Sequence, residues 1–272
     1  MIPSNRKYID EYFKSLSIDL KSIINELNSN NTDIDLGYRI QASAVFSSNI
    51  EGNSIDLNSY MNSQLSKKRF KPEKDLDEID DLVAAYQYAK SNTLNHDNFL
   101  TAHRLLSQNL LIQSKQGEYR SEKMGVFDSD GLVYLAVEPE FVPAKMLEFF
   151  DDISELLIAD LSIEEIFYHA SMIHLVFVHI HPFSDGNGRA ARLLEKWFLA
   201  QKIGEMAWGI QSEKYYKENQ SNYYDNINLG VNYYELDYDR CLPFLNMLVD
   251  SVDSPSKEQR KNEYGNNNKN GK

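Results

Sequence analysis

The stretch that decides the fold of this chain is His181-Pro182-Phe183-Ser184-Asp185-Gly186-Asn187-Gly188-Arg189-Ala190-Ala191-Arg192. Two glycines flank Asn187 just before a predicted helix, so backbone N–H groups and the positive end of the helix dipole converge where no Cβ atom intervenes. Arg189 and Arg192 lie three residues apart in the first turn, where both guanidinium groups can face one anion. The pattern predicts a cradle for a phosphate group.

Two further residues add chemistry to this cradle. Asp185 would repel a bare phosphate, but its hard oxygen atoms suit a Mg²⁺ ion that bridges phosphate oxygens, so the predicted ligand is a magnesium-bound polyphosphate. His181 lies four residues upstream, where its imidazole can accept the proton of an incoming hydroxyl group at neutral pH. The stretch therefore indicates a general base beside a charged electrophile.

A metal-dependent hydrolase is the rival interpretation, with His179 and His181 as a His-x-His pair completed by Asp185. It leaves the Gly-Asn-Gly sequence and both arginines unexplained, so we favour the phosphate site. The acidic turn at 128–131 lacks the later ligands of a calcium loop, and calcium is not expected there. Structural roles in the core or at the surface are predicted for three other histidines, His96, His169 and His174.

The quoted stretch matches the signature of the Fic family of nucleotidyltransferases, His-Pro-Phe-x-Asp/Glu-Gly-Asn-Gly-Arg-x-x-Arg, at every specified position. The chain resembles this family from about His96 to Asp250, including the GEYR segment at 117–120. The resemblance implies transfer of AMP from ATP to a Ser, Thr or Tyr hydroxyl group of another protein, with Mg²⁺ as cofactor.

The resemblance also assigns roles to single residues. His181 would be the catalytic base, and Phe183 would pack under the loop and fix the rotamer of that histidine. The nucleotide would be bound by Asp185 through Mg²⁺, by Asn187 at the α-phosphate, by the N–H groups of Gly186 to Gly188, and by Arg189 and Arg192 at the outer phosphates.

Two more segments match features of the family. The predicted hairpin at 124–137 resembles the flap that holds a target polypeptide by main-chain pairing, and Val126, Phe127, Asp128 and Ser129 would lie near the nucleotide. Tyr223 and Tyr224 match a tyrosine pair on the adenine side, where an aromatic ring can stack on a base. Packing within a Tyr-rich helical region is the open alternative for both tyrosines.

The segment Ser47-Ser48-Asn49-Ile50-Glu51-Gly52 resembles the inhibitory motif of the family, Ser/Thr-x-x-x-Glu-Gly/Asn. By this resemblance Ser47 and Glu51 are inhibitory residues. A glutamate at the end of such a helix can pair with Arg192 and occupy the guanidinium group that the γ-phosphate needs. We therefore expect a transferase that is inhibited in cis.

Hydrophobic periodicity predicts helices over 8–27, 36–50, 75–91, 99–111, 143–159, 162–179, 189–202 and 215–248, with a β-hairpin between residues 124 and 137. The expected fold class is mainly α, a Fic/Fido-type helical bundle with one hairpin flap and an N-terminal helical extension. The expected parts are an N-terminal helical region at 1–95 with the inhibitory helix at about 36–53, a catalytic core at 96–250, and a disordered tail at 251–272.

Composition limits the environment and the partners. The chain has 272 residues, with 41 Asp and Glu against 28 Lys and Arg, which gives a formal net charge of −13. We expect neither nucleic acid nor a membrane as a partner, but a target protein on the hairpin, with a second copy of the chain as a further candidate. The single Cys241 and the charged N-terminus favour a cytoplasmic protein.

Other functions with the same residues stay open at this stage. One is removal of AMP from a modified protein, with Glu51 positioning a water molecule. Another is transfer of UMP, phosphocholine or a kinase-type phosphate, although the intact Gly-Asn-Gly-Arg sequence and Asp185 favour AMP. The third is a regulatory module that binds a nucleotide without turnover, against which the presence of His181 argues, since binding alone needs no base.

Overall fold

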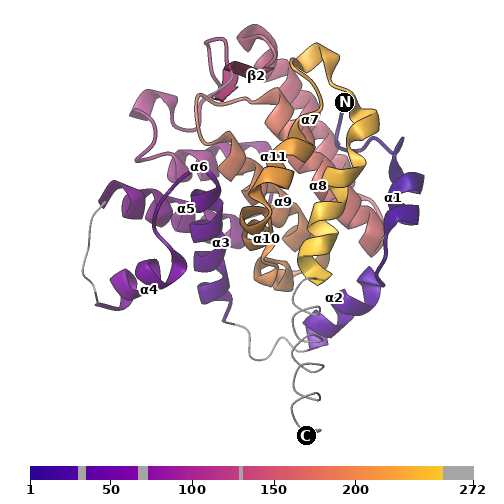
Figure 1. Ribbon diagram of the computed structural model, residues 1–272, viewed down its shortest axis with the longest axis horizontal. Coiled ribbons are helices and arrows are strands. Elements are labelled where there is room, and N and C mark those ends of the chain that lie inside the picture. Colours follow the sequence, from indigo (N-terminus) through magenta and orange to yellow (C-terminus); the bar gives the residue numbers. More distant parts are fainter. Residues whose placement is uncertain (30–34, 67–72, 129–130, 254–272) are drawn as a thin grey trace, which may run out of the picture.

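The computed structural model describes residues 1–29, 35–66, 73–128 and 131–253. Its centre is a pair of helices, α8 (Ile163–Ile180) and α9 (Asn187–Ile203), which pack side by side and are joined by the loop of the quoted stretch (Figure 1). Most side chains of α8 are buried on all sides, as expected for a helix that is apolar all round. The motif therefore lies at one end of the most buried part of the molecule.

The other elements surround this pair (Figure 1). Before the motif come α1 (Ile9–Ser15), α2 (Leu20–Ser29), α3 (Leu36–Ile50), α4 (Leu57–Ser66), α5 (Glu73–Ser91), α6 (His96–Leu106), β1 (Gly125–Asp128), β2 (Gly131–Leu135) and α7 (Val142–Ile158). After it come α10 (Ser212–Glu218), α11 (Gln220–Ile227) and a helical stretch at 242–253. The predicted mainly α fold with one hairpin is confirmed.

One hydrophobic core connects these elements. Its buried residues run from Tyr8 to Val252, so the N-terminal helices pack on the same core as α8 and α9. Helix α3 begins at the N-cap Asp35, whose carboxylate accepts a hydrogen bond from the N–H group of Tyr38. It ends at Ile50, and its C-cap residue Glu51 lies directly beside the motif loop. Helix α8 begins with the predicted capping box of Ser162 and Glu165.

Several predicted helix boundaries are wrong. The expected helix over 8–27 is two helices, because the chain is extended at Leu16 and the carboxylate of Asp19 starts α2 by accepting from the N–H group of Ser22. The helix expected at 99–111 begins at His96, after the N-cap Asn95, and ends at Leu106. Helix α4 was not predicted.

The C-terminal part also differs from the prediction. The Tyr-rich region is broken into α10, α11 and short 3₁₀ turns before the helical stretch at 242–253 begins. Residues 251–253, assigned to a disordered tail, are helical and buried, because Val252 packs in the core. The rest of that predicted tail, 254–272, lies outside the described residues.

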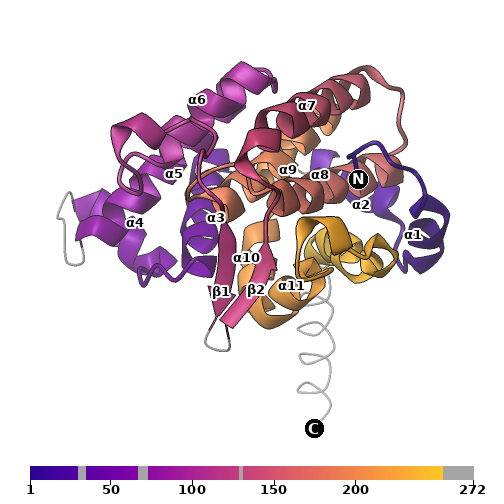
Figure 2. The same ribbon diagram turned by 90° about the horizontal axis from the view of Figure 1, so that it is seen from above.

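In the view from above, the hairpin is seen between α3 and α11 (Figure 2). Its strands pair antiparallel from Gly125–Leu135 to Asp128–Gly131, with an irregularity in register between Val126 and Phe127. Beyond the hairpin, the N–H group of Leu135 donates to the carbonyl oxygen of Val231 at 2.9 Å, so a second segment borders the β2 strand at its end.

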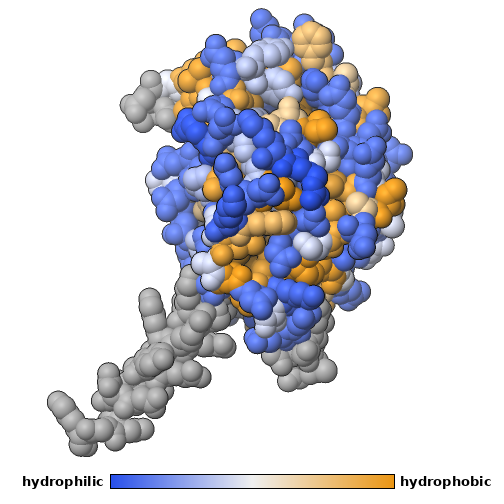
Figure 3. All heavy atoms as spheres, turned by 90° about the vertical axis from the view of Figure 1, so that its right-hand side faces the viewer, coloured by the Kyte–Doolittle hydropathy of each residue, from blue (hydrophilic) through white to orange (hydrophobic). Residues whose placement is uncertain are grey.

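On the face that carries α1, hydrophobic residues form separate patches among hydrophilic ones (Figure 3). Among the described helices, none combines the length and the apolar character that crossing a membrane would require.

Candidate active site

The loop after α8 has a backbone that the surrounding chain must enforce. His181, at the C-terminal end of α8, has φ of +52°, the left-handed region that is unfavourable for a residue with a side chain. Arg120, which is 3% exposed, binds this loop from outside. Its guanidinium group donates to the carbonyl oxygens of His181 at 2.7 Å and Val137 at 2.6 Å. Its backbone N–H group donates to the carbonyl oxygen of Pro182 at 2.9 Å.

Phe183 and Asn187 close the loop from inside. The amide of Asn187 accepts from the N–H group of Phe183 and donates to its carbonyl oxygen, both at 2.9 Å. Both ends of this side chain are thus bonded to the loop itself, which differs from the predicted role at the α-phosphate. The ring of Phe183 stacks on His103, with centroids 3.4 Å apart and planes at 8°.

His103 supports the same loop from α6. Its Nδ1 accepts from the N–H group of Gly117, so its Nε2 donates to the carbonyl oxygen of Asp185, both at 3.0 Å. Burial lowers the pKa of His103 to about 4, which keeps the imidazole neutral for this pattern. A Cβ atom on Gly186, whose φ is +79°, would lie 3.0 Å from Leu106, so the loop needs glycine there.

The predicted pair of Glu51 and Arg192 is present. Nη2 of Arg192 lies 2.6 Å from Oε1 of Glu51 and 3.0 Å from the carbonyl oxygen of Ser47, and Nε donates to the hydroxyl group of Ser47 at 2.8 Å. The guanidinium group is completely buried. The end of α3 therefore occupies two of its three nitrogen atoms.

The carboxylate of Glu51 also fills the anion cradle. A Cβ atom placed on Gly188 would collide with Oε1 of Glu51, so the carboxylate lies against the first turn of α9. Here N–H groups have no intrahelical acceptor. Removal from water raises the pKa of Glu51, but Arg192, Arg189 and His181 offset this, and the net pKa is below the usual value. An anion of this chain thus lies where the sequence predicts phosphate.

Arg189 and Asp185 are held less tightly. Arg189 is buried, and its guanidinium group lies 3.5 Å from the carboxylates of both Glu78 and Asp185. Its Nε is buried and has no hydrogen-bond partner within the described chain. The side chain of Asp185 is 53% exposed, and its Oδ1 accepts from the N–H group of Gly186 at 2.6 Å.

The hairpin and the tyrosine pair border the opposite side of the site. Val126 and Phe127 are exposed on β1; the side chain of Asp128 and all of Ser129 lie outside the described structure. Tyr223 and Tyr224 differ, since Tyr223 is 1% exposed and packs in the core, whereas Tyr224 is 45% exposed. The hydroxyl group of Tyr224 donates to the carbonyl oxygen of Ile50, at the end of α3.

These parts enclose a pocket of about 560 Å³. Glu51, Val126, Phe127, His181, Arg192 and Tyr224 are among the residues that line it. The predicted base, the predicted inhibitory glutamate and the predicted flap thus meet in one cavity, which is large enough for a small ligand.

The rival metal site is not formed. Nδ1 of His179 accepts from the hydroxyl group of Tyr238 at 2.8 Å and Nε2 donates to the carbonyl oxygen of Ile227 at 2.9 Å, so neither nitrogen is free for a metal. Among the described residues, no three His, Cys, Asp or Glu side chains gather in a metal-binding group. The hydrolase interpretation is therefore wrong.

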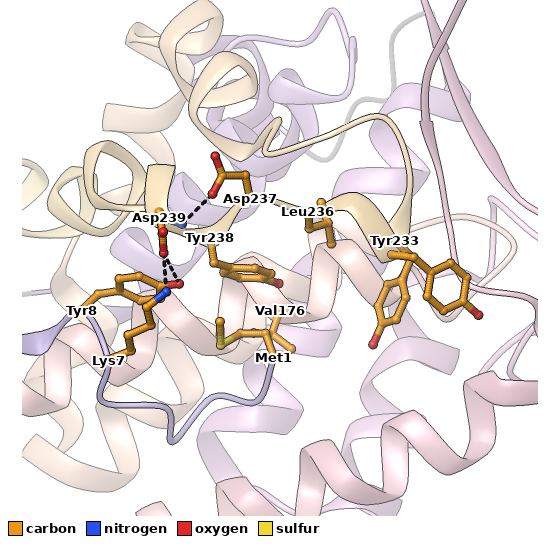
Figure 4. Close-up of a pocket in the computed structure, with 10 residues that line it drawn as sticks. Met1, Lys7, Tyr8, Val176, Tyr233, Leu236, Asp237, Tyr238 and Asp239 are labelled. Carbon is orange, nitrogen blue, oxygen red and sulfur yellow. Dashed lines mark hydrogen bonds and ion pairs between the residues drawn. The ribbon is translucent and has the colours of Figure 1, made fainter.

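A second pocket, of about 420 Å³, lies between the N-terminal segment and residues 233–239 (Figure 4). Its charged groups bind one another, since Nζ of Lys7 and the hydroxyl group of Tyr8 both bind Oδ1 of Asp239. None of the motif residues lines it. We assign the chemistry to the pocket beside His181.

Sequence reasoning missed two residues that shape the site, His103 and Arg120. The signal for Arg120 was present, because it is the last residue of the GEYR segment. His103 had no signal, since a histidine within an amphipathic helix resembles any half-buried polar residue.

The helical bundle, the motif loop and the hairpin together define a Fic domain. Residues 93–199 match the Fic/DOC family. Of solved structures, a Fic family protein from Desulfovibrio desulfuricans G20 is similar, with a TM-score of 0.74 and 22% identity over 97% of this chain and 78% of that one. Fic-1 (residues 134–508) from C. elegans has a TM-score of 0.68 and 18% identity over 95% and 73%.

Curated relatives carry the name protein adenylyltransferase Fic. That of Culex quinquefasciatus is 28% identical over 190 residues, which cover 66% of this chain and 35% of that protein. That of Nematostella vectensis is 36% identical over 120 residues, which cover 44% and 26%. The matched part of this chain thus spans about a third or less of these relatives' length.

Proposed function

We propose that this chain is a protein adenylyltransferase that transfers AMP from ATP to a Ser, Thr or Tyr hydroxyl group of a target protein, and that Glu51 inhibits it in cis. The relatives' names support the type of reaction. The observation that carries the proposal is the carboxylate of Glu51 at the first turn of α9, bonded to Arg192. A site that receives an anion of its own chain in this way suits a phosphate ligand.

His181 is the proposed general base. Its Nδ1 lies 3.2 Å from the carbonyl oxygen of Val178, which can only accept, so Nδ1 carries the proton and Nε2 is free to take another. Removal from water lowers the pKa of His181 to about 4, so the imidazole is neutral at pH 7. It can accept the proton of the target hydroxyl as that oxygen bonds to the α-phosphorus and the bond to the β-phosphate oxygen breaks.

The same loop stabilises the charge of the transferring group. The N–H groups at the start of α9 are preorganised donors that need no rearrangement during the reaction. Arg192 and Arg189 are placed to bind the outer phosphates, which leave as pyrophosphate. Arg192 can do so only after Glu51 has left Nη2, which explains how one side chain blocks the reaction without obstructing the whole pocket.

Asp185 fits a magnesium ion. Its carboxylate is exposed at the entrance to the cradle, and Mg²⁺ needs one or two protein carboxylates when phosphate and water oxygens complete its shell. When bound, the ion would neutralise charge on the phosphates and the leaving pyrophosphate.

The target polypeptide is proposed to lie along the hairpin at 124–137. Main-chain groups of a strand edge can pair with an added strand of almost any sequence, and the hairpin borders the pocket that contains His181. This arrangement would bring a hydroxyl group of the target towards the base.

Transfer of label from [α-³²P]ATP with Mg²⁺ tests the proposal. The proteins are wild type, Glu51→Gly and Glu51→Gly with His181→Ala, each assayed alone and with a cell lysate. We expect weak labelling by wild type, strong labelling by Glu51→Gly, and a loss of about 10²–10⁴-fold when the base is removed. Label from [γ-³²P]ATP or [α-³²P]UTP, with none from [α-³²P]ATP, would instead identify another transferred group.

AMP removal is a second candidate, because Glu51 and His181 line the same pocket and could together position and activate a water molecule. Its test is release of AMP from a labelled target by wild type and loss of release in Glu51→Gly. A nucleotide-binding module without turnover would bind ATP equally well in wild type and His181→Ala and label nothing in any variant.

A further inference from the structure

Behind Arg192 lies a chain of buried polar groups that the proposed reaction does not use. Nη1 of Arg192 donates to the hydroxyl oxygen of Tyr223 at 3.1 Å, and that hydroxyl group lies 2.9 Å from Nε2 of His174. Nδ1 of His174 lies 2.8 Å from Oε2 of Glu195. We call Tyr223, His174 and Glu195 the buried relay. They belong to α11, α8 and α9, and all are at most 1% exposed.

The direction of the hydrogen bonds in the relay follows from the chemistry of its ends. An arginine can only donate, so the hydroxyl oxygen of Tyr223 accepts from Arg192 and its proton is donated to Nε2 of His174. Nδ1 of His174 then carries a proton and donates to the carboxylate of Glu195. Each group thus donates a hydrogen bond to the next one, and the series begins at the cation Arg192 and ends at the anion Glu195.

The carboxylate of Glu195 has no lysine or arginine of its own among the described residues. Its hydrogen-bond partners are His174 and the hydroxyl group of Tyr216, which donates at 2.9 Å. The neighbouring buried cation, Lys196, is paired with Glu213 instead. A buried carboxylate without a directly bound cation is costly. The charge of Glu195 interacts with that of nearby Lys196, and its hydrogen bonds lead through the relay to Arg192.

Arg192 needs such a partner when the enzyme is active. With Glu51 in place, a carboxylate binds the completely buried guanidinium group directly. When Glu51 leaves, that counter-charge is lost before the phosphates of ATP replace it. Two hydrogen-bonded routes then lead from Arg192 to a carboxylate. One runs through Ser47 and Tyr86 to Glu213, which is already paired with Lys196, and the other is the relay to Glu195.

We propose that Glu195, acting through His174 and Tyr223, holds Arg192 in the position that binds the outer phosphates of ATP after Glu51 has withdrawn. The three are positioning residues, since none of them is assigned to the reacting atoms. This inference rests on the proposed function and adds to it: the affinity of the site for the outer phosphates is set by a carboxylate in the interior of the bundle.

The experiment compares two ligands that differ only in these phosphates. Titration calorimetry in the Glu51→Gly background measures binding of α,β-methylene-ATP, which cannot release pyrophosphate, and of AMP, which lacks the outer phosphates. The variants are Tyr223→Phe and Glu195→Gln, which keep the shape of each side chain. The matched control is Tyr168→Phe, which removes another buried hydroxyl group of α8, bonded to the carbonyl oxygen of Asn5.

Each relay variant is expected to bind the ATP analogue about tenfold more weakly, the usual effect of losing a hydrogen bond to a charged group, and AMP within about twofold of the parent. The Tyr168→Phe control should change neither. In label transfer, the relay variants should raise KM for ATP and leave kcat largely intact.

Equal weakening of both ligands would show a general packing defect and overturn the inference, as would unchanged binding of the ATP analogue. If Glu195→Gln fails to fold in a thermal denaturation assay, Tyr223→Phe alone decides, because it leaves Glu195 and His174 in place. If the Glu51→Gly parent itself binds neither ligand, both the proposed function and the role of the relay are rejected. If the parent binds both ligands and the relay variants bind them equally well, only the role of the relay is rejected.

Discussion

The pocket beside His181 has two unlike sides. On the side of the motif loop and α3, Glu51, Arg192 and Asn187 are bonded to defined partners at 2.6–3.1 Å. On the hairpin side, the apolar residues Val126 and Phe127 line the pocket, and Phe127 is 70% exposed. The motif side is fixed by polar contacts, whereas the hairpin side presents exposed apolar side chains to the pocket.

The difference matches two tasks of the proposed transferase. Charge on a phosphate group is stabilised by donors that are already in place, which the first side supplies. A target polypeptide is held by strand pairing and by apolar contact, which tolerate many sequences and suit the second side. Changes on the motif side should therefore alter the reaction itself, and changes on the hairpin side should alter only which proteins are modified, and how fast.

The largest effect is expected from Gly188→Ala in the Glu51→Gly background. The new Cβ atom would lie in the anion cradle, 3.2 Å from Nη1 of Arg192. Label transfer should fall by about 10²–10³-fold, the usual result of disturbing preorganised donors. Because alanine favours a helix over glycine, the melting temperature should not fall. An unchanged rate would show that phosphate does not bind at the first turn of α9.

Acid should weaken the motif side through its buried histidines. Burial lowers the pKa values of His103 and His179 to about 4, whereas unfolded histidine titrates near its usual value of about 6.5. Between these values the unfolded chain binds more protons, so the free energy of unfolding falls as the pH falls. Urea denaturation should show a loss of order 1–2 kcal/mol for each such histidine between pH 7 and about pH 5, and His181, whose pKa is also lowered to about 4, adds a third contribution.

The same histidines provide the control for that prediction. His103→Asn should make the loss between the two pH values smaller, although it lowers stability at pH 7, because the stacking with Phe183 is lost. A loss that is the same in wild type and variant would assign the effect to other groups.

The motif side was also the part that the sequence predicted best. Its loop and both arginines lie within twelve consecutive residues, so local sequence defines their chemistry. The pair of Glu51 and Arg192, 141 residues apart, was predicted only because a second short motif includes Glu51. The supporting contacts of Arg120 and His103 depend on tertiary packing, which no local pattern encodes.

Errors in the predicted fold have a similar cause. The apolar residues over 8–27 have helical spacing throughout. The chain nevertheless becomes extended at Leu16, and Asp19 caps a new helix, and a pattern averaged over many residues does not detect changes at single positions. The role predicted for Asn187 at the α-phosphate stays a prediction. Its amide is bonded to Phe183 within the loop, a contact that the sequence does not reveal before the loop has folded.

A smaller effect is expected where α10 and α11 hold the end of α3. The last carbonyl oxygens of α3 accept hydrogen bonds from Nζ of Lys217 at 2.8 Å, Nε2 of Gln220 at 2.7 Å and the hydroxyl group of Tyr224 at 3.1 Å. These donors satisfy helix-end acceptors and fix the position of Glu51.

Lys217→Met should therefore release inhibition in part. Loss of one such hydrogen bond should raise label transfer by otherwise wild-type protein about five- to tenfold. The matched control is Lys214→Met, one turn earlier on α10, which removes only a surface pair with Glu218. If both variants behave alike, the contact with the end of α3 does not set the inhibition.

The smallest effect is expected on the hairpin, from Leu132→Ser in the Glu51→Gly background. Leu132 is 50% exposed on β2, so its loss should change the free energy of unfolding by no more than about 0.5 kcal/mol. ATP binding should stay the same, while labelling of lysate proteins should fall by about two- to threefold, the size of a lost cross-strand contact. Leu65→Ser, which alters an exposed leucine on α4, should leave labelling unchanged. If Leu132→Ser instead weakens ATP binding, the two sides of the pocket share one task, and the division between reaction and target selection does not hold.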